Sequence, residues 1–342
     1  MQQAIQTLLD GKSLDAPSAA RVMGAIMAGE ASEAQIGALL VLLRQRGETV
    51  DEIVGFVRAM RERAVRVLPP PGIVLDTCGT GGDAAGTLNI STLAALVAAA
   101  AGVRVAKHGN RSASGRVGSA DLLEALGLRL DLGPDGIATL LQDTGFGFLF
   151  APRHHPAMRH AASARRALGV RTVFNLLGPL TNPAGATHQL LGLCDGHRTI
   201  QFATVLRDLG CERALVVHGE DGTDEISTAA PTAVVELQDG RLQHSVWRPE
   251  DFGVPRSGLA SLSGGDLSTN VAIARSVLRG EPGPCLDAVA LNAGAALYLT
   301  GAASDVGAGV VAARELLHSG RVQQKLDAIV TAARRLPAAE AT

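Results

Sequence analysis

The stretch DTCGTGGD, residues 76–83, contains three glycines within four positions and is followed by NIST, residues 89–92. The apolar run IVL, 73–75, precedes it, and an alanine-rich helical pattern covers 93–101. This order predicts a strand, a glycine loop and the start of a helix. Glycines carry no side chain, so the backbone amides of such a loop can close on an anion. Beside a helix N-terminus, the loop is suited to hold phosphate.

Other glycine patterns fit this loop poorly. A P-loop requires Lys and then Ser or Thr after its last glycine, whereas Gly82 is followed by Asp83 and Ala84. The dinucleotide fingerprint is matched in form, but it needs an acidic residue about 20 positions further on. No acidic residue occurs between Asp83 and Asp121. A tight turn without a ligand is a third interpretation, although so many glycines cost much chain entropy.

Composition limits the class of protein. The 342 residues are enough for two domains or for one large α/β unit with an appended piece. Apolar residues make up 46% of the chain and aromatic residues only 3%, so a large core of aliphatic side chains and alanine is expected. The formal net charge of −2 argues against a broad basic face that binds nucleic acid.

The sequence carries no sign of export or membrane insertion. Its N-terminus lacks a basic region followed by an apolar one, and no apolar stretch approaches the ~18 residues of a membrane span. The cysteines Cys78, Cys194, Cys211 and Cys285 have no metal-ligand spacing and are typical of reduced thiols. We therefore expect a soluble, cytoplasmic protein that binds neither membranes nor nucleic acid.

The pattern of secondary structure changes at the proline run 69–71, which stops helix formation. Residues 1–68 predict helices only, with capping boxes at Ser32–Gln35 and Thr49–Glu52. Afterwards, apolar strands alternate with helices, which implies a mostly parallel sheet flanked by helices on both faces. We expect the α/β fold class, with a small all-helical domain over 1–68 and a larger α/β domain over 72–342.

The expected strands are short apolar runs at 73–75, 103–106, 147–150, 190–193 and 214–218, with an antiparallel hairpin over 232–237 and 242–246. In open α/β sheets, ligands bind beyond the carboxyl ends of the strands. The chemically suggestive segments follow these ends: the glycine loop, 107–112, 151–155 and 219–225. Their convergence predicts one site.

Two of these segments have a distinct chemistry. The loop KHGNRSASGRVGS, 107–119, combines cations, amide and hydroxyl donors with glycines, which suits a second anionic group. The turn DGTDE, 221–225, offers oxygen ligands that suit Mg²⁺, although an acidic turn is often only solvated.

The segment 151–155 contains two histidines, and the helix predicted after it contains two arginines. Arg165 and Arg166 lie on a predicted helix over 158–168, where neighbouring side chains point about 100° apart, so at most one faces a pocket. His154 and His155 are either acid–base groups or loop residues that cap the next helix.

Together these segments resemble the anthranilate phosphoribosyltransferase family, which belongs to the nucleoside-phosphorylase-like class of phosphoribosyltransferases. The matching segments, in the family's order, are DTCGTGGD (76–83), NIST (89–92), KHGNR (107–111), GSADLLEALG (118–127), FAPRHHPAMRHA (150–161), RTVFNLLGPLTNPA (171–184) and DGTDEIS (221–227). The N-terminal helices and ALNAGAALYLTG (290–301) also fit, so the resemblance covers essentially the whole chain.

The resemblance implies a fold and a reaction. A helical hairpin near 155–185 would complete the helical domain, and the α/β domain would bind phosphoribosyl pyrophosphate (PRPP). The enzyme would transfer the 5-phosphoribosyl group of PRPP to the amine of anthranilate and release pyrophosphate, a step of tryptophan biosynthesis. Mg²⁺ would be the cofactor, and the enzyme would be a homodimer joined through its helical domain.

The resemblance also assigns site residues by position. PRPP would be bound by Gly79, Thr80, Gly81, Gly82, Asp83, Thr87, Asn89, Ser91, Thr92, Lys107 and Ser119. Anthranilate would be bound by Gly79, His108, Asn110, Pro152, Arg165 and Gly178, and Mg²⁺ by Ser91, Asp224 and Glu225. No residue is assigned as a general acid or base, because a weakly basic aromatic amine needs little activation.

The chain departs from the family pattern at SGRV, 114–117, where Ser-Ser-Lys-Ser is more frequent, and at Ser163, where Pro is common. Arg116 keeps the positive charge of the lysine but presents a planar guanidinium in place of a single ammonium donor. Binding of pyrophosphate by this loop is therefore the weakest of the assignments. Three other functions stay open: a pyrimidine-nucleoside phosphorylase, a non-catalytic homologue that binds nucleic acid, and a homologue with a different aromatic amine acceptor.

Overall fold

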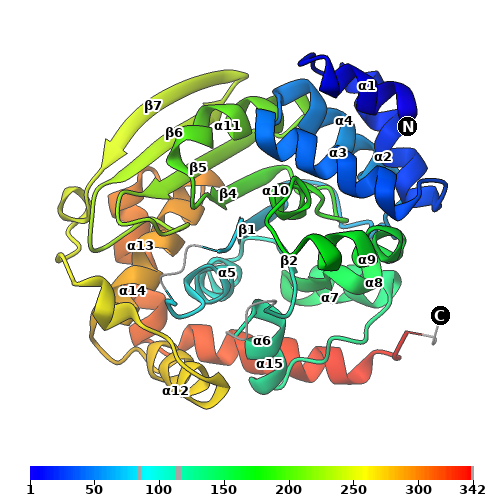
Figure 1. Cartoon of the computed structure of the whole chain (residues 1–342). Helices are drawn as coiled ribbons and strands as arrows, with labels where there is room; N and C mark the ends of the chain where they lie inside the picture. The colour runs from blue at the N-terminus through cyan, green and yellow to red at the C-terminus, as the bar shows by residue number, and fades with distance from the viewer. Residues whose placement is uncertain (83–85, 113–116, 340–342) are drawn as a thin grey trace.

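The computed structural model describes residues 1–82, 86–112 and 117–339. Within these ranges, seven strands form one sheet in the order β3-β2-β1-β4-β5-β6-β7 (Figure 1). They are β1 (Leu75–Gly79), β2 (Val105–Gly109), β3 (Phe146–Phe150), β4 (His188–Gly192), β5 (Arg213–Gly219), β6 (Thr232–Gln238) and β7 (Arg241–Trp247). Strands β1 to β5 pair in parallel, whereas β6 and β7 form the predicted antiparallel hairpin at one edge. The predicted mostly parallel sheet is confirmed.

The strands β1 and β2 lie further along the chain than the apolar runs 73–75 and 103–106 predicted. The cause is that β1 occupies the middle of the sheet, where both its edges pair, so its main-chain hydrogen bonds continue through polar residues. Asp76 and Thr77 are consequently fully buried within the strand. The first half of the glycine motif is therefore strand, and the loop proper starts at Thr80.

The helices are α1 (Gln2–Leu9), α2 (Ala16–Ala28), α3 (Glu33–Arg46), α4 (Val50–Glu62), α5 (Ile90–Ala100), α6 (Ser119–Ala125), α7 (Pro134–Thr144), α8 (Ala151–His154), α9 (Arg159–Leu168), α10 (Phe174–Leu177), α11 (Thr199–Asp208), α12 (Leu267–Leu278), α13 (Pro284–Leu299), α14 (Val306–His318) and α15 (Arg321–Arg335). Both predicted capping boxes are present, at the starts of α3 and α4. None of the described helices combines the length and apolar character that a bilayer span requires.

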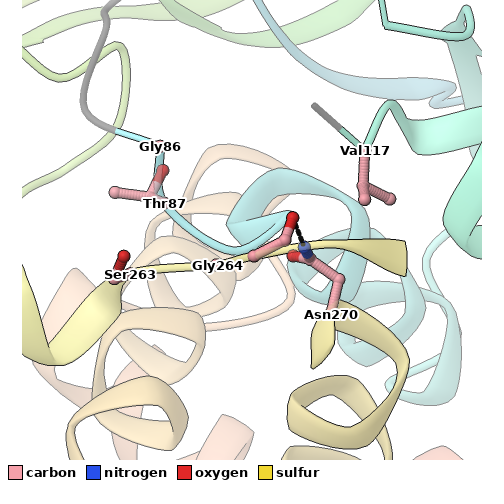
Figure 2. Close-up of a pocket in the computed structure, with 7 residues that line it drawn as sticks. Gly86, Thr87, Val117, Ser263, Gly264 and Asn270 are labelled. Carbon is pink, nitrogen blue, oxygen red and sulfur yellow. Dashed lines mark hydrogen bonds between the residues drawn. The ribbon is translucent and has the colours of Figure 1, made fainter. Parts of the chain in front are cut away.

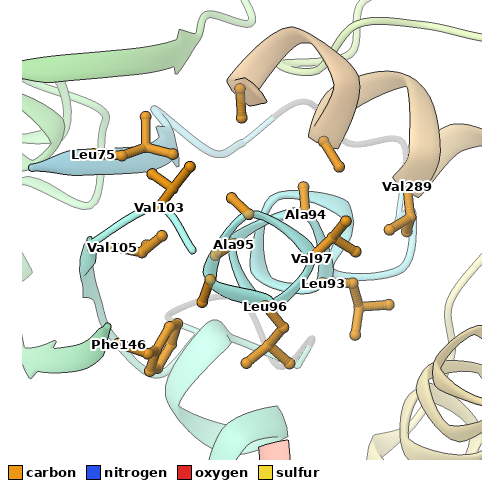
Figure 3. Close-up of a cluster of buried hydrophobic side chains, with 14 of the residues drawn as sticks. Leu75, Leu93, Ala94, Ala95, Leu96, Val97, Val103, Val105, Phe146 and Val289 are labelled. Atoms are coloured by element: carbon orange, nitrogen blue, oxygen red, sulfur yellow. The ribbon is translucent and has the colours of Figure 1, made fainter. Parts of the chain in front are cut away.

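Helices cover both faces of the sheet, which produces two hydrophobic cores. On one face α5 is surrounded by the sheet and by α13, and its side chains Leu93, Leu96 and Val97 are buried (Figure 3). On the other face α11, α9, α10 and the N-terminal helices share a second core. Neighbouring β4 residues point to opposite faces, and accordingly Leu190 belongs to the first core and Leu191 to the second.

The strand order places a switch point between β1 and β4. From β1 the chain continues outward to β2 and β3, and it then returns to form β4 on the other side of β1. Loops that leave the carboxyl ends of these two strands therefore diverge and open a crevice, where ligands bind in folds of this kind. The register pairs Gly79 with Gly192 at this point, so neither strand places a side chain there.

Candidate active site

The acidic turn and the glycine loop meet at the switch point. The Gly81 amide donates a hydrogen bond to Asp224 Oδ2 at 2.7 Å. A Cβ atom at Gly79 would lie 2.2 Å from the same carboxylate oxygen, and one at Gly192 would lie 1.6 Å from the Asp224 carbonyl oxygen. Two glycines on neighbouring strands thus make the room into which the turn fits. The loop at 79–82 and the turn at 224–225 are consequently in direct contact.

The start of α5 lies beside the glycine loop and the acidic turn. We call these three segments, 79–82, 89–92 and 224–225, the rim. Glu225 Oε1 accepts a hydrogen bond from the Ser91 amide at 3.1 Å. The Ser91 hydroxyl lies 3.4 Å from Lys107 Nζ. The three side chains predicted to bind Mg²⁺, Ser91, Asp224 and Glu225, are therefore gathered at the end of β1 and the start of α5. This set of hydroxyl and carboxylate oxygens matches the hard ligands that Mg²⁺ prefers.

Lys107 is placed beneath this rim and not on its surface. Its side chain is only 2% exposed, and Nζ donates to the Thr77 carbonyl oxygen at 2.6 Å. Burial lowers the pKa of Lys107, while the buried Asp76 carboxylate nearby opposes that shift. Asp76 in turn accepts hydrogen bonds from the His108 amide and the Asn182 side chain. A buried network therefore fixes Lys107 under the helix start.

The other residues predicted to bind PRPP are spread around the rim. The Asn89 side chain donates to the Val117 carbonyl oxygen at 2.9 Å, and Thr92 is buried in α5. Thr87 lines a cavity of about 250 Å³ together with Ser263, Gly264 and Asn270 of another segment (Figure 2). The Ser119 hydroxyl contacts the Asn110 carbonyl oxygen at 3.4 Å. Asp83 lies outside the described residues.

A second cavity, of about 420 Å³, contains five of the six residues predicted to bind anthranilate: His108, Asn110, Pro152, Arg165 and Gly178. The sixth, Gly79, is not part of its lining and lies instead against Asp224. The Arg165 guanidinium stacks over the Phe174 ring with 5.1 Å to its centroid. Arg166 is exposed, so only one member of this arginine pair faces the cavity, as the helical spacing predicted.

The two histidines of this cavity lie in surroundings that favour the uncharged ring. The His108 and His155 rings contact each other edge to face, with centroids 5.2 Å apart. Burial first, and repulsion from a neighbouring histidine second, lower the pKa of His108 to about 3 and of His155 to about 4. Within the described part of the chain, neither Nε2 atom has a hydrogen-bond partner. The cavity therefore offers neutral polar groups beside the cations Arg159 and Arg165.

Comparison with known proteins agrees with this geometry. The model of the glycosyl transferase family α/β domain matches residues 71–323, and that of its helical bundle domain matches residues 2–64. The anthranilate phosphoribosyltransferase of Thioalkalivibrio sulfidiphilus is 51% identical over 331 residues, which cover 97% of this chain and 98% of that protein. The chain belongs to the anthranilate phosphoribosyltransferase family.

Solved structures of this family have the same fold. The crystal structure of the Thermus thermophilus anthranilate phosphoribosyltransferase superposes with a TM-score of 0.92 at 49% identity, covering 97% of this chain and 99% of that one. The Saccharomyces cerevisiae enzyme in complex with PRPP and Mg gives a TM-score of 0.90 at 25% identity, covering 98% of both chains. The small helical domain with a larger α/β domain is thereby confirmed as the fold class.

The structure adds residues that the sequence analysis missed. Met60 of α4, Met158 and Phe174 also line the second cavity. In the sequence they occupy ordinary apolar positions of helices, so no local signal separates them from core residues. Gly192 was missed because it lies within an apolar strand, although a glycine inside a strand can signal a close backbone approach.

Replacing Gly192 with Ala tests whether the close approach of the acidic turn matters. The added methyl group would overlap the Asp224 carbonyl, so the turn must move. Since a displacement of ~1 Å in an active site costs about 100-fold in rate, we expect kcat/KM for PRPP to fall by about that factor. Steady-state kinetics at several Mg²⁺ concentrations measure the change.

Gly258→Ala is the matched control, because among the described residues no atom lies within 4 Å of a Cβ at that position. The control variant is expected to retain wild-type kinetics. If Gly192→Ala also retained them, the proposed fit between turn and strand would be wrong.

Proposed function

We propose that the chain transfers the 5-phosphoribosyl group of PRPP to the amine of anthranilate and releases pyrophosphate, as an enzyme of tryptophan biosynthesis. The observation that carries this proposal is the meeting of the glycine loop, the α5 start and the acidic turn at one rim. Relatives at about half identity over nearly their full length carry the name of this reaction. The chain is accordingly a glycosyltransferase.

The donor half of the site is assigned to the rim. The amides of Gly81 and Ser91, which donate to Asp224 and Glu225 in this structure, would be the donors to the pyrophosphate and phosphate groups of PRPP, with Asn89, Ser91 and Thr92 at the helix start. Lys107 would supply positive charge from beneath Ser91, since its ammonium group lies 3.4 Å from that hydroxyl. We assign Thr80, Thr87, Asp83 and Ser119 to the same substrate from the family pattern.

Mg²⁺ is the cofactor that these residues fit. Asp224, Glu225 and the Ser91 hydroxyl would hold it, because they supply oxygen ligands within one small region. When bound with PRPP, Mg²⁺ neutralises charge on the departing pyrophosphate. The Asp224 carboxylate accepts the hydrogen bond of the Gly81 amide in this structure. If the carboxylate bound the metal instead, this amide would become available to a phosphate group.

The acceptor half of the site is assigned to the cavity beside α9. Arg165 would meet the anthranilate carboxylate, a role that a planar guanidinium performs well. Phe174 fixes that guanidinium by stacking beneath it. The uncharged rings of His108 and His155 leave the amine nucleophilic and do not compete for the carboxylate. Positioning and electrostatic stabilisation then supply most of the rate of a dissociative displacement at the anomeric carbon.

The organisation of the protein in the cell is part of the proposal. Two domains divide near residues 69–71, and the hairpin over 155–185 completes the helical one, since α9 packs against α2 and α3. Homodimer formation through the helical domain is inferred from the family resemblance, and Leu9 and Val41 leave apolar side chains exposed on α1 and α3. Cytoplasmic location is supported by the four cysteines, all of which are free thiols.

The alternatives that the sequence left open predict different substrates. A pyrimidine-nucleoside phosphorylase would cleave thymidine in the presence of phosphate. A nucleic-acid-binding homologue would shift an oligonucleotide in a salt-dependent way. A fluorescence assay that follows loss of anthranilate with PRPP, with and without Mg²⁺, tests the proposed reaction, and absence of Mg²⁺-dependent loss would contradict it. Substituted anthranilates in the same assay define the range of acceptors.

Removal of both acidic side chains tests the metal assignment. We expect Asp224→Ala combined with Glu225→Ala to lower Mg²⁺-dependent turnover by more than about 100-fold, because the charge of the leaving group is no longer offset. The double variant should retain the wild-type circular dichroism spectrum. The adjacent exposed pair Glu250 and Asp251 provides a control of equal charge change. Wild-type turnover after loss of the first pair would refute the assignment.

Arg165→Ala tests the acceptor site. Loss of charge-assisted hydrogen bonds to a carboxylate costs a factor of roughly 10 to 100 in affinity, so we expect KM for anthranilate to rise by that amount while KM for PRPP stays nearly constant. Arg166→Ala is the matched control, because that neighbour is exposed outside the cavity. A larger rise in KM for PRPP than for anthranilate would count against this role.

A further inference from the structure

Arg171 also contacts the glycine loop, through carbonyl groups that the acidic turn does not use. Its Nη1 donates a hydrogen bond to the Gly81 carbonyl oxygen at 2.9 Å, and Nη2 lies 3.5 Å from the Thr80 carbonyl oxygen. A Cβ atom on Gly82 would lie 1.5 Å from Nη1. The guanidinium can therefore rest on the loop only because residue 82 has no side chain.

The peptide groups of Gly81 are thus held from two directions. Its amide donates to Asp224, and its carbonyl accepts from Arg171. Both Gly81 and Gly82 have positive φ angles, 64° and 77°, in the left-handed region. Glycines lose more conformational freedom on ordering than other residues do, so this loop needs external contacts to keep one shape. Arg171 supplies such a contact with a charged donor, which forms stronger hydrogen bonds than a neutral one.

The position of Arg171 in the chain links the two halves of the site. It lies between α9 and α10, in the stretch that also supplies Arg165, Phe174 and Gly178 to the acceptor cavity. A segment that lines the acceptor cavity therefore also holds the loop of the donor rim. The sequence motif RTVFN, 171–175, was part of the resemblance, but the sequence analysis gave its arginine no role.

We propose that Arg171 is a positioning residue for donor binding: from the acceptor-side segment, it holds the glycine loop in the shape that presents its amides to PRPP. The inference rests on the proposed function of the rim. Arg171 acts through the loop carbonyls and not on the reacting atoms. Its loss leaves every loop amide chemically intact and keeps the contact of Gly81 with Asp224, but it removes the contact on the Gly81 carbonyl, so binding of the donor weakens and binding of the acceptor is nearly unaffected.

Arg171→Ala, Arg171→Lys and Arg104→Ala test this proposal. Arg104 is the matched control, because its Nη1 donates to two consecutive carbonyl oxygens, of Pro70 and Pro71, each at 3.0 Å, at the amino end of β2 away from the rim. The measurements are kcat and both KM values at saturating Mg²⁺, together with the melting temperature of each variant.

In Arg171→Ala, KM for PRPP should rise roughly 10- to 100-fold, the scale of one charge-assisted hydrogen bond, and KM for anthranilate should change by less than about 3-fold. Arg171→Lys should recover part of the loss, since an ammonium group can still reach one carbonyl oxygen. Arg104→Ala should leave both KM values unchanged. An unchanged KM for PRPP in Arg171→Ala, or an equal rise in both KM values or in the control, would overturn the proposal.

Calorimetric binding of Mg²⁺ and pyrophosphate separates this inference from the reaction itself. Weaker binding of pyrophosphate to Arg171→Ala than to the wild type and to Arg104→Ala supports the positioning role without any turnover. Equal binding by all three proteins contradicts it. Absence of wild-type turnover with PRPP and anthranilate would instead refute the proposed function.

Discussion

The close approach of Asp224 to the paired glycines, with its carboxylate against Gly79 and its backbone against Gly192, is the constraint on which the site depends. A side chain on either strand would occupy the place of the turn, because its Cβ atom would overlap Asp224. Because the turn fits there, Asp224 reaches the Gly81 amide and Glu225 reaches the Ser91 amide. Three segments distant in sequence thereby meet around one space at the switch point of the sheet.

The sheet topology explains why these segments meet. The strand order reverses at β1 and β4, and the glycine loop that leads to α5 starts at the end of β1. The alanine-rich α5 is enclosed by the sheet and by α13, so packing on both sides holds the helix in place (Figure 3). Neighbouring residues of β2 then reach two different places, since Lys107 points toward Ser91 and His108 lines the second cavity. One strand thus lies between the rim and the cavity that also holds the cations Arg159 and Arg165.

Much of this arrangement could be predicted from the sequence, because the decisive signals are local. The glycine motif, the capping boxes of α3 and α4 and the apolar strands each follow from short patterns, and the rule on strand ends gathers the predicted residues. The end of β1 was misplaced, because a central strand keeps its pairing through Asp76 and Thr77. Contacts between distant segments left no local signal, so Gly192 was missed, and no pattern marked Met60 as a cavity residue.

A crystal structure with Mn²⁺ and pyrophosphate bound would test the central claim most directly, because Mn²⁺ shares the oxygen ligands of Mg²⁺ and gives anomalous scattering. We predict an anomalous peak in contact with Asp224 or Glu225, beside the Ser91 end of α5, with pyrophosphate on the amides of the glycine loop. A peak at a position that none of these three side chains reaches would contradict the account.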